Sequence, residues 1–168
     1  DYTMREDVEI MQAGQTVNVK PKLYICKNGV YNPGYELTRV NRNTSDRLAI
    51  TNGDGYIEYS SVNPEVGYGL TPENAFDLSR FSRFVCIGYL VNNYNSTGGI
   101  CNIAIVKDST GSSAWTDSVN SQIASASFPN ESKEFYIPLS EELKKQTLYV
   151  GLFQSGKIIS RIQSMWLE

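Results

Sequence analysis

The stretch from Phe76 to Asn92, FDLSRFSRFVCIGYLVN, decides the fold. Its second half is apolar at both alternating sets of positions, namely Phe84, Cys86 and Leu90 on one side and Val85, Ile87, Tyr89 and Val91 on the other. Because alternate residues of a strand point to opposite faces of its sheet, such a strand needs cover on both faces. We therefore predict the central strand of a β-sandwich here.

The central strand is followed by a polar, glycine-ended segment, 92–99, and then by a second apolar run from Ile100 to Lys107. We expect these two runs to pair. In that register Cys86 would face the region of Val106 and lie about 17 Å from Cys101 along the strand, which is beyond disulfide reach. The chain's three cysteines, Cys26, Cys86 and Cys101, are thus predicted to be buried thiols.

Two hairpins are predicted elsewhere. The turn Asn52-Gly53-Asp54-Gly55 separates Arg47–Thr51 from the alternating run Tyr56–Ser61. Asn52 and Asp54 could also begin a calcium loop, but Glu58 does not stand at the closing position of such a loop, so a turn is favoured. Near the C-terminus, Ser155-Gly156 separates two alternating runs, Leu148–Phe153 and Ile158–Leu167, which predict a closing hairpin.

Helical signals are few. Ser140 precedes Glu141 and Glu142 as the cap of one helical turn that reaches Lys145, and Thr71-Pro72 resembles the start of a second turn. Residues 1–20 fit a helix or strands equally well, and 113–123 could form a short helix, since Trp115, Val119 and Ile123 are four apart. For 108–127 we favour a long loop with a strand near Ile123 to Phe128.

Composition places the chain in one domain. The 168 residues are 40% hydrophobic and 20% charged, and they include no histidine, which excludes Ser-His and Cys-His nucleophile pairs and imidazole zinc ligands. A net charge of -3 with scattered Lys and Arg does not indicate nucleic-acid binding. No run of about 18 apolar residues predicts a membrane span. We expect no cofactor, no nucleic-acid partner and no membrane insertion.

Short runs joined by Gly, Pro and Asn turns predict an all-β, antiparallel two-sheet sandwich, arranged as a jelly roll, with one or two short helical turns. The expected domain spans 23–168. Residues 1–22 would be a connector or an edge hairpin from a longer parent protein, since the chain begins at Asp1 rather than at a methionine.

Four phrases carry a resemblance to a known family: LYICKNG, FDLSRFSRF, FYIPLSEEL and LYVGLFQSGKIISRIQSMWLE. Their order resembles the carbohydrate-binding-module-like β-sandwich domains of tail, baseplate and receptor-binding proteins of bacteriophages and prophages of Gram-positive bacteria. The resemblance covers roughly Leu23 to Glu168. It implies a virion tail or cell-surface location and a role in host adhesion or tail structure, in an oligomeric parent protein.

We expect a non-catalytic module that binds surface glycan or cell-wall polysaccharide, or that holds neighbouring copies or tail subunits. Aromatic rings stack on sugars and short polar side chains bind their hydroxyls, so the candidate ligand-binding residues are Tyr31, Tyr35, Asn93, Tyr94, Asn95, Trp115 and Asp117. Two alternatives stay open. One is a small glycosidase or lyase that uses a pair of carboxylates, and the other is an extracellular carbohydrate-binding module of a bacterial surface protein.

Overall fold

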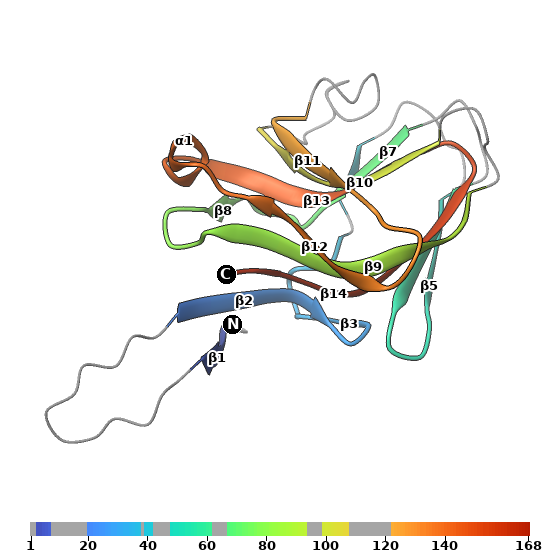
Figure 1. Cartoon of the computed structure of the whole chain (residues 1–168), viewed down its shortest axis with the longest axis horizontal. Coiled ribbons are helices and arrows are strands. Elements are labelled where there is room, and N and C mark those ends of the chain that lie inside the picture. Colours follow the sequence, from blue (N-terminus) through green and yellow to red (C-terminus); the bar gives the residue numbers. More distant parts are fainter. Residues whose placement is uncertain are drawn as a thin grey trace, which may run out of the picture.

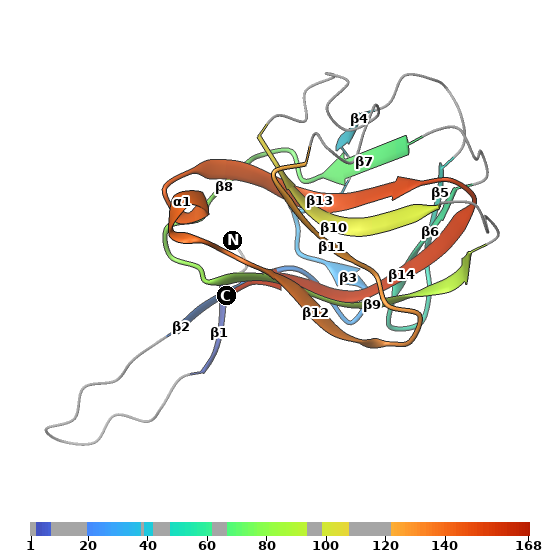
Figure 2. The same ribbon diagram turned by 45° about the horizontal axis from the view of Figure 1, so that its top comes forward.

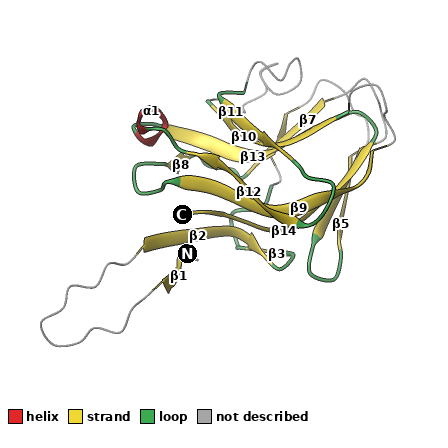
Figure 3. Ribbon diagram, in the orientation of Figure 1, coloured by secondary structure: helices red, strands yellow, loops and turns green. Residues whose placement is uncertain are grey.

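The computed structural model describes residues 3–7, 20–37, 39–41, 48–61, 67–93, 99–107 and 122–168. Within these residues the chain folds into two antiparallel sheets and one short helix (Figure 1). Nearly all of the ribbon between the turns is strand (Figure 3). The predicted all-β, two-sheet antiparallel sandwich with a short helical turn is therefore confirmed.

The larger sheet contains eight of the described strands. They are β1 (Thr3–Asp7), β2 (Lys20–Lys27), β3 (Val30–Tyr31), β5 (Leu48–Asn52), β6 (Ile57–Ser61), β9 (Arg83–Asn93), β12 (Lys133–Pro138) and β14 (Ile158–Leu167). The smaller sheet contains six, namely β4 (Arg39–Asn41), β7 (Gly67–Thr71), β8 (Phe76–Asp77), β10 (Ile100–Val106), β11 (Ala124–Ser127) and β13 (Thr147–Ser155).

The core lies between the two sheets, whose stacking is visible in Figure 2. Alternation along each strand sends one set of side chains into it. From the larger sheet these include Phe84, Ile162 and Leu167, and from the smaller sheet Ile103 and Leu152, all fully buried. Continuous burial of this kind on two facing sheets is the main source of stability in a sandwich.

The strand predicted to be central, β9, lies inside the larger sheet, paired with β12 on one edge and β14 on the other. Its outward residue Val85 is as buried as its inward neighbour Phe84, because Tyr24 and Trp166 pack beside it on the outer face. This explains why both alternating sets of β9 are apolar. The cover on the outer face comes from side chains of neighbouring strands.

The expected pairing of β9 with the following run is wrong. That run is β10, and it belongs to the smaller sheet, where it pairs with β11 and β13. The two apolar strands therefore face each other across the core instead of lying side by side. Cys86 consequently sits between Phe135 and Met165 in the larger sheet. All three cysteines are buried, as predicted, and free, and burial raises the pKa of the Cys26 thiol to about 12.

The predicted closing hairpin is also wrong, although both of its strands exist. The strand β13 pairs with β7, β8 and β10 in the smaller sheet, while β14 pairs with β2, β6 and β9 in the larger one. The turn at Gly156, whose φ is 94°, carries the chain from one sheet to the other. An alternating pattern predicts that a strand has one buried face, but it does not show which sheet the strand joins.

A buried amide ties the sheets together at this crossing. Gln154 of β13 is fully buried. Its Nε2 lies 3.2 Å from the Tyr59 carbonyl and 3.1 Å from the Ile158 carbonyl, and its Oε1 accepts a hydrogen bond from the Ser160 hydroxyl at 2.6 Å. All of these partners belong to the larger sheet. The amide therefore joins the two layers where no backbone ladder can.

The shorter elements agree with most of the sequence predictions. The turn 53–56 joins β5 and β6 as a hairpin, as predicted. The helix α1 (Glu141–Lys144) begins at Ser140, whose hydroxyl accepts a bond from the Leu143 amide. A second helical turn at Thr71 was expected wrongly, because Thr71 is the last residue of β7. The strand expected near 123–128 is β11.

The larger sheet forks at β14. Along one edge β14 pairs with β9, whereas its other edge pairs first with β6 and then with β2. The turn Asn28-Gly29 fills the point of the fork, since the Gly29 amide donates to the Gln163 carbonyl at 2.8 Å and the Asn28 amide to the Ser164 hydroxyl at 3.0 Å. In Figure 1 the branches diverge from this point, one seen at β2 and the other at β5, which pairs with β6.

Replacing Gln154 by leucine should lower the free energy of unfolding by about 2 to 4 kcal/mol, because several buried polar groups lose their partner. Urea unfolding at equilibrium measures the change. Gln146→Leu is the control, since Gln146 is half-exposed and its side chain donates to the Glu142 carbonyl near the surface, and it should change stability by less than about 0.5 kcal/mol. Equal effects of the two variants would contradict the role of the buried amide.

Gly29→Ala should destabilise more than Gly34→Ala. Both glycines have positive φ, 77° and 90°, where any side chain costs about 1 to 2 kcal/mol. A Cβ on Gly29 would in addition lie 2.3 Å from the Tyr56 amide nitrogen, whereas Gly34 has open space. Because of this clash, we expect Gly29→Ala to lower the free energy of unfolding by about 1 to 3 kcal/mol more than Gly34→Ala does. Urea unfolding of both variants tests this, and equal losses would disprove a tight packing of the fork.

Candidate functional site

The outer face of the larger sheet carries a row of apolar and aromatic side chains that crosses four strands. Tyr136 of β12 is opposite Val85 of β9, Val85 is opposite Trp166 of β14, and Trp166 is opposite Tyr24 of β2. We call these four residues the aromatic row. Tyr24 and Trp166 have ring centroids 5.5 Å apart, within the range of favourable aromatic pairs.

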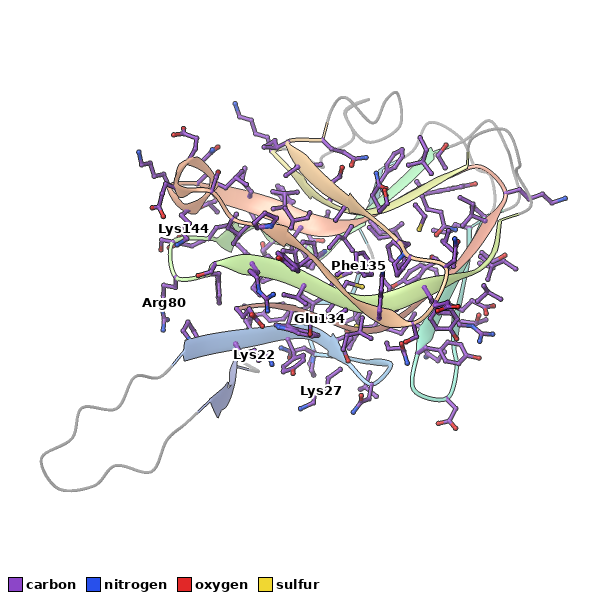
Figure 4. All side chains as sticks on the ribbon, viewed as in Figure 1. Lys22, Lys27, Arg80, Glu134, Phe135 and Lys144 are labelled. Atoms are coloured by element: carbon purple, nitrogen blue, oxygen red, sulfur yellow. The ribbon has the colours of Figure 1, made fainter. Side chains whose placement is uncertain are left out.

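Exposure differs along the aromatic row. The Tyr136 side is open, with 45% of the residue exposed, whereas Trp166 and Tyr24 are only 4% and 5% exposed. The ammonium of Lys22 lies 4.8 Å from the Trp166 ring centroid, and that of Lys27 lies 4.8 Å from the centroid of Tyr24. Figure 4 labels both lysines along β2. Two lysine ends therefore lie over the rings at one end of the row.

An ion-paired arginine frames the other end. Arg83 lies over the ring of Tyr136, 4.5 Å from its centroid. Its Nε donates to Glu168 at 2.8 Å, and its Nη2 is 3.8 Å from the Glu134 carboxylate. Glu168 also accepts the indole N–H of Trp166 at 2.7 Å. Burial raises the pKa of Glu168, but the bonds from Trp166 and Arg83 outweigh it and hold that pKa below its usual value.

A second group of residues lies further along β14, and we call it the arginine cluster: Tyr56, Glu58, Tyr89 and Arg161. Register places Tyr89 of β9, Arg161 of β14 and Glu58 of β6 side by side across three strands. The Arg161 guanidinium lies 4.1 Å from the Tyr56 ring centroid, donates to Glu58 at 2.9 Å and donates to the Tyr89 hydroxyl at 3.1 Å. These contacts hold all four side chains in one arrangement.

The arginine cluster is accessible as well as ordered. About a quarter of each charged side chain is exposed, 26% for Arg161 and 25% for Glu58, and the two tyrosines are half-buried. It offers a guanidinium donor, a carboxylate acceptor and two ring surfaces on neighbouring strands of one sheet. Such a combination can bind the hydroxyls of a neutral polar ligand while a ring covers its apolar face.

Two of the predicted ligand-binding residues are packed against the main core. The Tyr31 hydroxyl is hydrogen-bonded to the hydroxyl of buried Tyr59, and burial raises the pKa of Tyr31 well above its usual value. Tyr35 meets Phe76 edge-on, with centroids 5.3 Å apart. Both rings are half-buried. Their contacts bind them to the scaffold, and a ligand role for them stays a prediction.

The other predicted ligand-binding residues are not brought together in the described part of the chain. Tyr94, Asn95, Trp115 and Asp117 lie outside the described residues, and Asn93 is the last residue of β9. Their role also stays a prediction. Over the ranges that are described, no group of three or more Cys, Asp or Glu side chains is placed to hold a metal ion, and no helix is long and apolar enough to cross a membrane.

Sequence reasoning missed both groups on the outer face. Their members come from strands that are distant in the chain, and only the sheet register brings Glu58, Tyr89 and Arg161 together. One signal was available in β14, where Arg161 and Trp166 stand among apolar and small polar residues and Glu168 follows directly after the strand. Polar and aromatic side chains on one face of a strand indicate a surface that does more than pack against the core.

Comparison with known proteins places the fold among carbohydrate-binding modules. No protein-family model matches the chain, and no curated protein matches its sequence. Among solved structures, a family 29 carbohydrate binding module is similar over 87% of this chain and 86% of that chain, with a TM-score of 0.53 and 12% identity.

Mutants of a family 29 module are also similar, one complexed with mannohexaose and another with cellulohexaose. Each has a TM-score of 0.53 and 12% identity, and covers 87% of this chain and 89% of the other. At this identity the likeness concerns the fold alone. The chain therefore has the β-sandwich fold found in these carbohydrate-binding modules.

Proposed function

We propose that this chain is a non-catalytic carbohydrate-binding module whose ligand lies on the outer face of the larger sheet. The observation that carries the proposal is the arginine cluster, in which Arg161 is held over Tyr56 and bonded to Glu58 and Tyr89 while all four side chains stay partly exposed. The similarity of the fold to family 29 carbohydrate binding modules, including one complexed with mannohexaose, supports it.

The chemistry of the arginine cluster suits a sugar. A pyranose has an apolar face of C–H groups and a rim of hydroxyls that both donate and accept hydrogen bonds. The ring of Tyr56 or Tyr89 can cover the apolar face, Arg161 can donate to one hydroxyl and Glu58 can accept from another. Since the arginine and the carboxylate already neutralise each other, the cluster fits a neutral glycan better than a strongly charged one.

The biological setting is a further part of the proposal. The resemblance of LYICKNG, FDLSRFSRF and the C-terminal phrases to phage tail and baseplate domains points to a module of a virion tail or of a cell surface. In that setting the glycan would be a host cell-wall polysaccharide, and neighbouring copies or tail subunits would be further partners. Binding to isolated Gram-positive cell walls, compared with walls stripped of polysaccharide, tests this setting.

A carbohydrate-active enzyme is the alternative. The outer face holds two neighbouring carboxylates, Glu134 and Glu168, around Arg83. A glycosidase needs one carboxyl group that stays protonated near neutral pH, whereas the pKa of Glu168 is held low. This counts against Glu168 as the acid of such a pair. Release of reducing ends from a bound polysaccharide would support the enzyme instead.

Arg161→Ala should weaken the binding of mannohexaose or of a soluble mannan by about tenfold or more. Truncating a central, partly buried anchor of an interface costs more than about 1 kcal/mol of binding free energy. Arg161→Lys should restore little, since an ammonium cannot stack and bond in the same planar way. Isothermal titration calorimetry measures both, with thermal unfolding to check that the fold is kept.

Arg80→Ala is the matched control for charge, because Arg80 is exposed in the turn before β9 (Figure 4) and lies outside the arginine cluster. It should bind as the unchanged protein does. A glycan that binds equally well to Arg161→Ala and Arg80→Ala would refute the proposed face. If Trp115→Ala or Tyr94→Ala abolished binding instead, the loops predicted from the sequence would hold the site.

A further inference from the structure

The outer face of the larger sheet repeats one combination of side chains at two places. In the arginine cluster, Arg161 lies over a tyrosine ring and is paired with a carboxylate. Arg83 is placed in the same way over Tyr136, with its guanidinium 4.5 Å from the ring centroid. Its carboxylate partners are Glu134 and Glu168. We call the second group, Arg83, Glu134, Tyr136 and Glu168, the Tyr136 cluster.

The Tyr136 cluster is open to solvent and ordered by its own contacts. Tyr136 is 45% exposed although Arg83 lies over its ring, and the Glu134 side chain is 47% exposed. Arg83 is fixed by Glu168, to which its Nε donates at 2.8 Å. A single exposed tyrosine needs no explanation. A ring held beside an ordered guanidinium and a carboxylate, however, offers both the surface and the polar groups that bind a sugar.

We propose that the Tyr136 cluster is a second sugar subsite, and that an extended neutral glycan runs along β9 from it to the arginine cluster. This inference rests on the proposed function and adds to it a second contact point and a condition on the length of the ligand. One sugar ring of the glycan covers Tyr136 and another covers Tyr89.

The charges of the Tyr136 cluster fit a neutral ligand. Two carboxylates, Glu134 and Glu168, surround one guanidinium, that of Arg83. Lys22 lies near enough to attract the Glu168 carboxylate as well. Two positive and two negative side chains thus meet here, so the subsite presents hydrogen-bonding groups to a ligand without a strong net charge.

The strand β9 connects the two subsites. Val85, which is opposite Tyr136, lies four positions from Tyr89 on the same face of β9, roughly 13 Å at the usual rise per strand residue. Half-buried Ile87 stands between them, opposite Glu134 of β12, which Figure 4 labels. A disaccharide seated on the arginine cluster is shorter than this separation, whereas a hexasaccharide is longer. Only an extended chain can therefore use both subsites.

A polar contact crosses β9 between the two subsites. The hydroxyl of Ser132 donates to the side-chain carbonyl of Gln163 at an exposed position. Ser132 directly precedes β12 and Gln163 belongs to β14, and β9 lies between these two strands. The contact leaves the amide nitrogen of Gln163 as a donor to a sugar hydroxyl. A glycan along β9 thus meets a hydrogen-bonding group between its two ends.

Isothermal titration calorimetry on the whole chain, with mannobiose and mannohexaose as probes, tests the second subsite. We expect the hexasaccharide to bind about tenfold more tightly than the disaccharide, or more, which is about 1.4 kcal/mol. Tyr136→Ala should weaken the hexasaccharide about tenfold, because an aromatic contact is lost, and should leave mannobiose unchanged. Tyr136→Phe should keep most of the affinity, since it keeps the ring.

Val30→Ala is the control for loss of an exposed apolar side chain. Val30 is 67% exposed and lies on β3, outside both clusters. It should leave both affinities unchanged. Because Tyr136 is nearly half exposed, Tyr136→Ala should keep the fold, and thermal unfolding of both variants checks this.

Chemical modification gives an independent measurement. Tetranitromethane nitrates accessible tyrosine rings, and mass spectrometry of peptides locates the product. Mannohexaose should protect Tyr136 from nitration. Tyr149 of β13 belongs to the smaller sheet, so its nitration should be the same with and without the sugar.

The outcomes separate the two proposals. If Arg161→Ala weakens mannohexaose but Tyr136→Ala does not, or if bound mannohexaose leaves the nitration of Tyr136 unchanged, the second subsite is disproved while the proposed function stands. If Tyr136→Ala weakens mannobiose as strongly as mannohexaose, the ligand does not need the extended path, which also overturns this inference. If neither mannohexaose nor cellohexaose binds, the proposed function fails together with it.

Discussion

The two-sheet arrangement depends on the buried amide of Gln154. The chain leaves the smaller sheet at β13 and enters the larger one at β14 through a turn at Gly156. Backbone groups of the two sheets cannot pair with each other across the core. Gln154 bridges this gap, since its amide lies within hydrogen-bond distance of the Tyr59 and Ile158 carbonyls and of the Ser160 hydroxyl. A polar side chain buried here is stable only with these partners, so it specifies how the layers meet.

The position of β14 follows from this crossing, and the outer face follows from β14. Because Gln154 fixes the start of β14, the strand runs through the larger sheet with β9 on one edge and with β6 and β2 on the other. Arg161 faces β6 and Trp166 faces β2, so the two branches of the fork supply different neighbours. Glu58 comes from one branch and Tyr24 from the other. A single strand thereby carries both the arginine cluster and the aromatic row.

Most strands can be predicted from the sequence, because buried strands show a local pattern of apolar residues and are bounded by turn residues. Examples of such local patterns are the two apolar sets of β9, the NGDG turn and the helix cap at Ser140. The sequence does not predict partners, since the same alternation suits either sheet. For that reason β10 and β14 were expected beside β9 and β13, although each pair is split between the sheets. The arginine cluster was missed for the same reason, because it exists only through the register of three strands.

The two arginines of the outer face are paired with carboxylates, so their main effect is on the orientation of side chains and not on the electrostatic potential. Arg161 is balanced by Glu58, and Arg83 by Glu168 and Glu134, while each guanidinium also lies over a tyrosine ring. Balanced charges at a partly exposed surface contribute little stability by themselves. Their effect is to fix the direction of donors, acceptors and ring faces on strands that are paired with neighbours in the sheet. Recognition at the arginine cluster should depend on how sugar hydroxyls are placed, and only weakly on ionic strength, since Arg161 is balanced by Glu58.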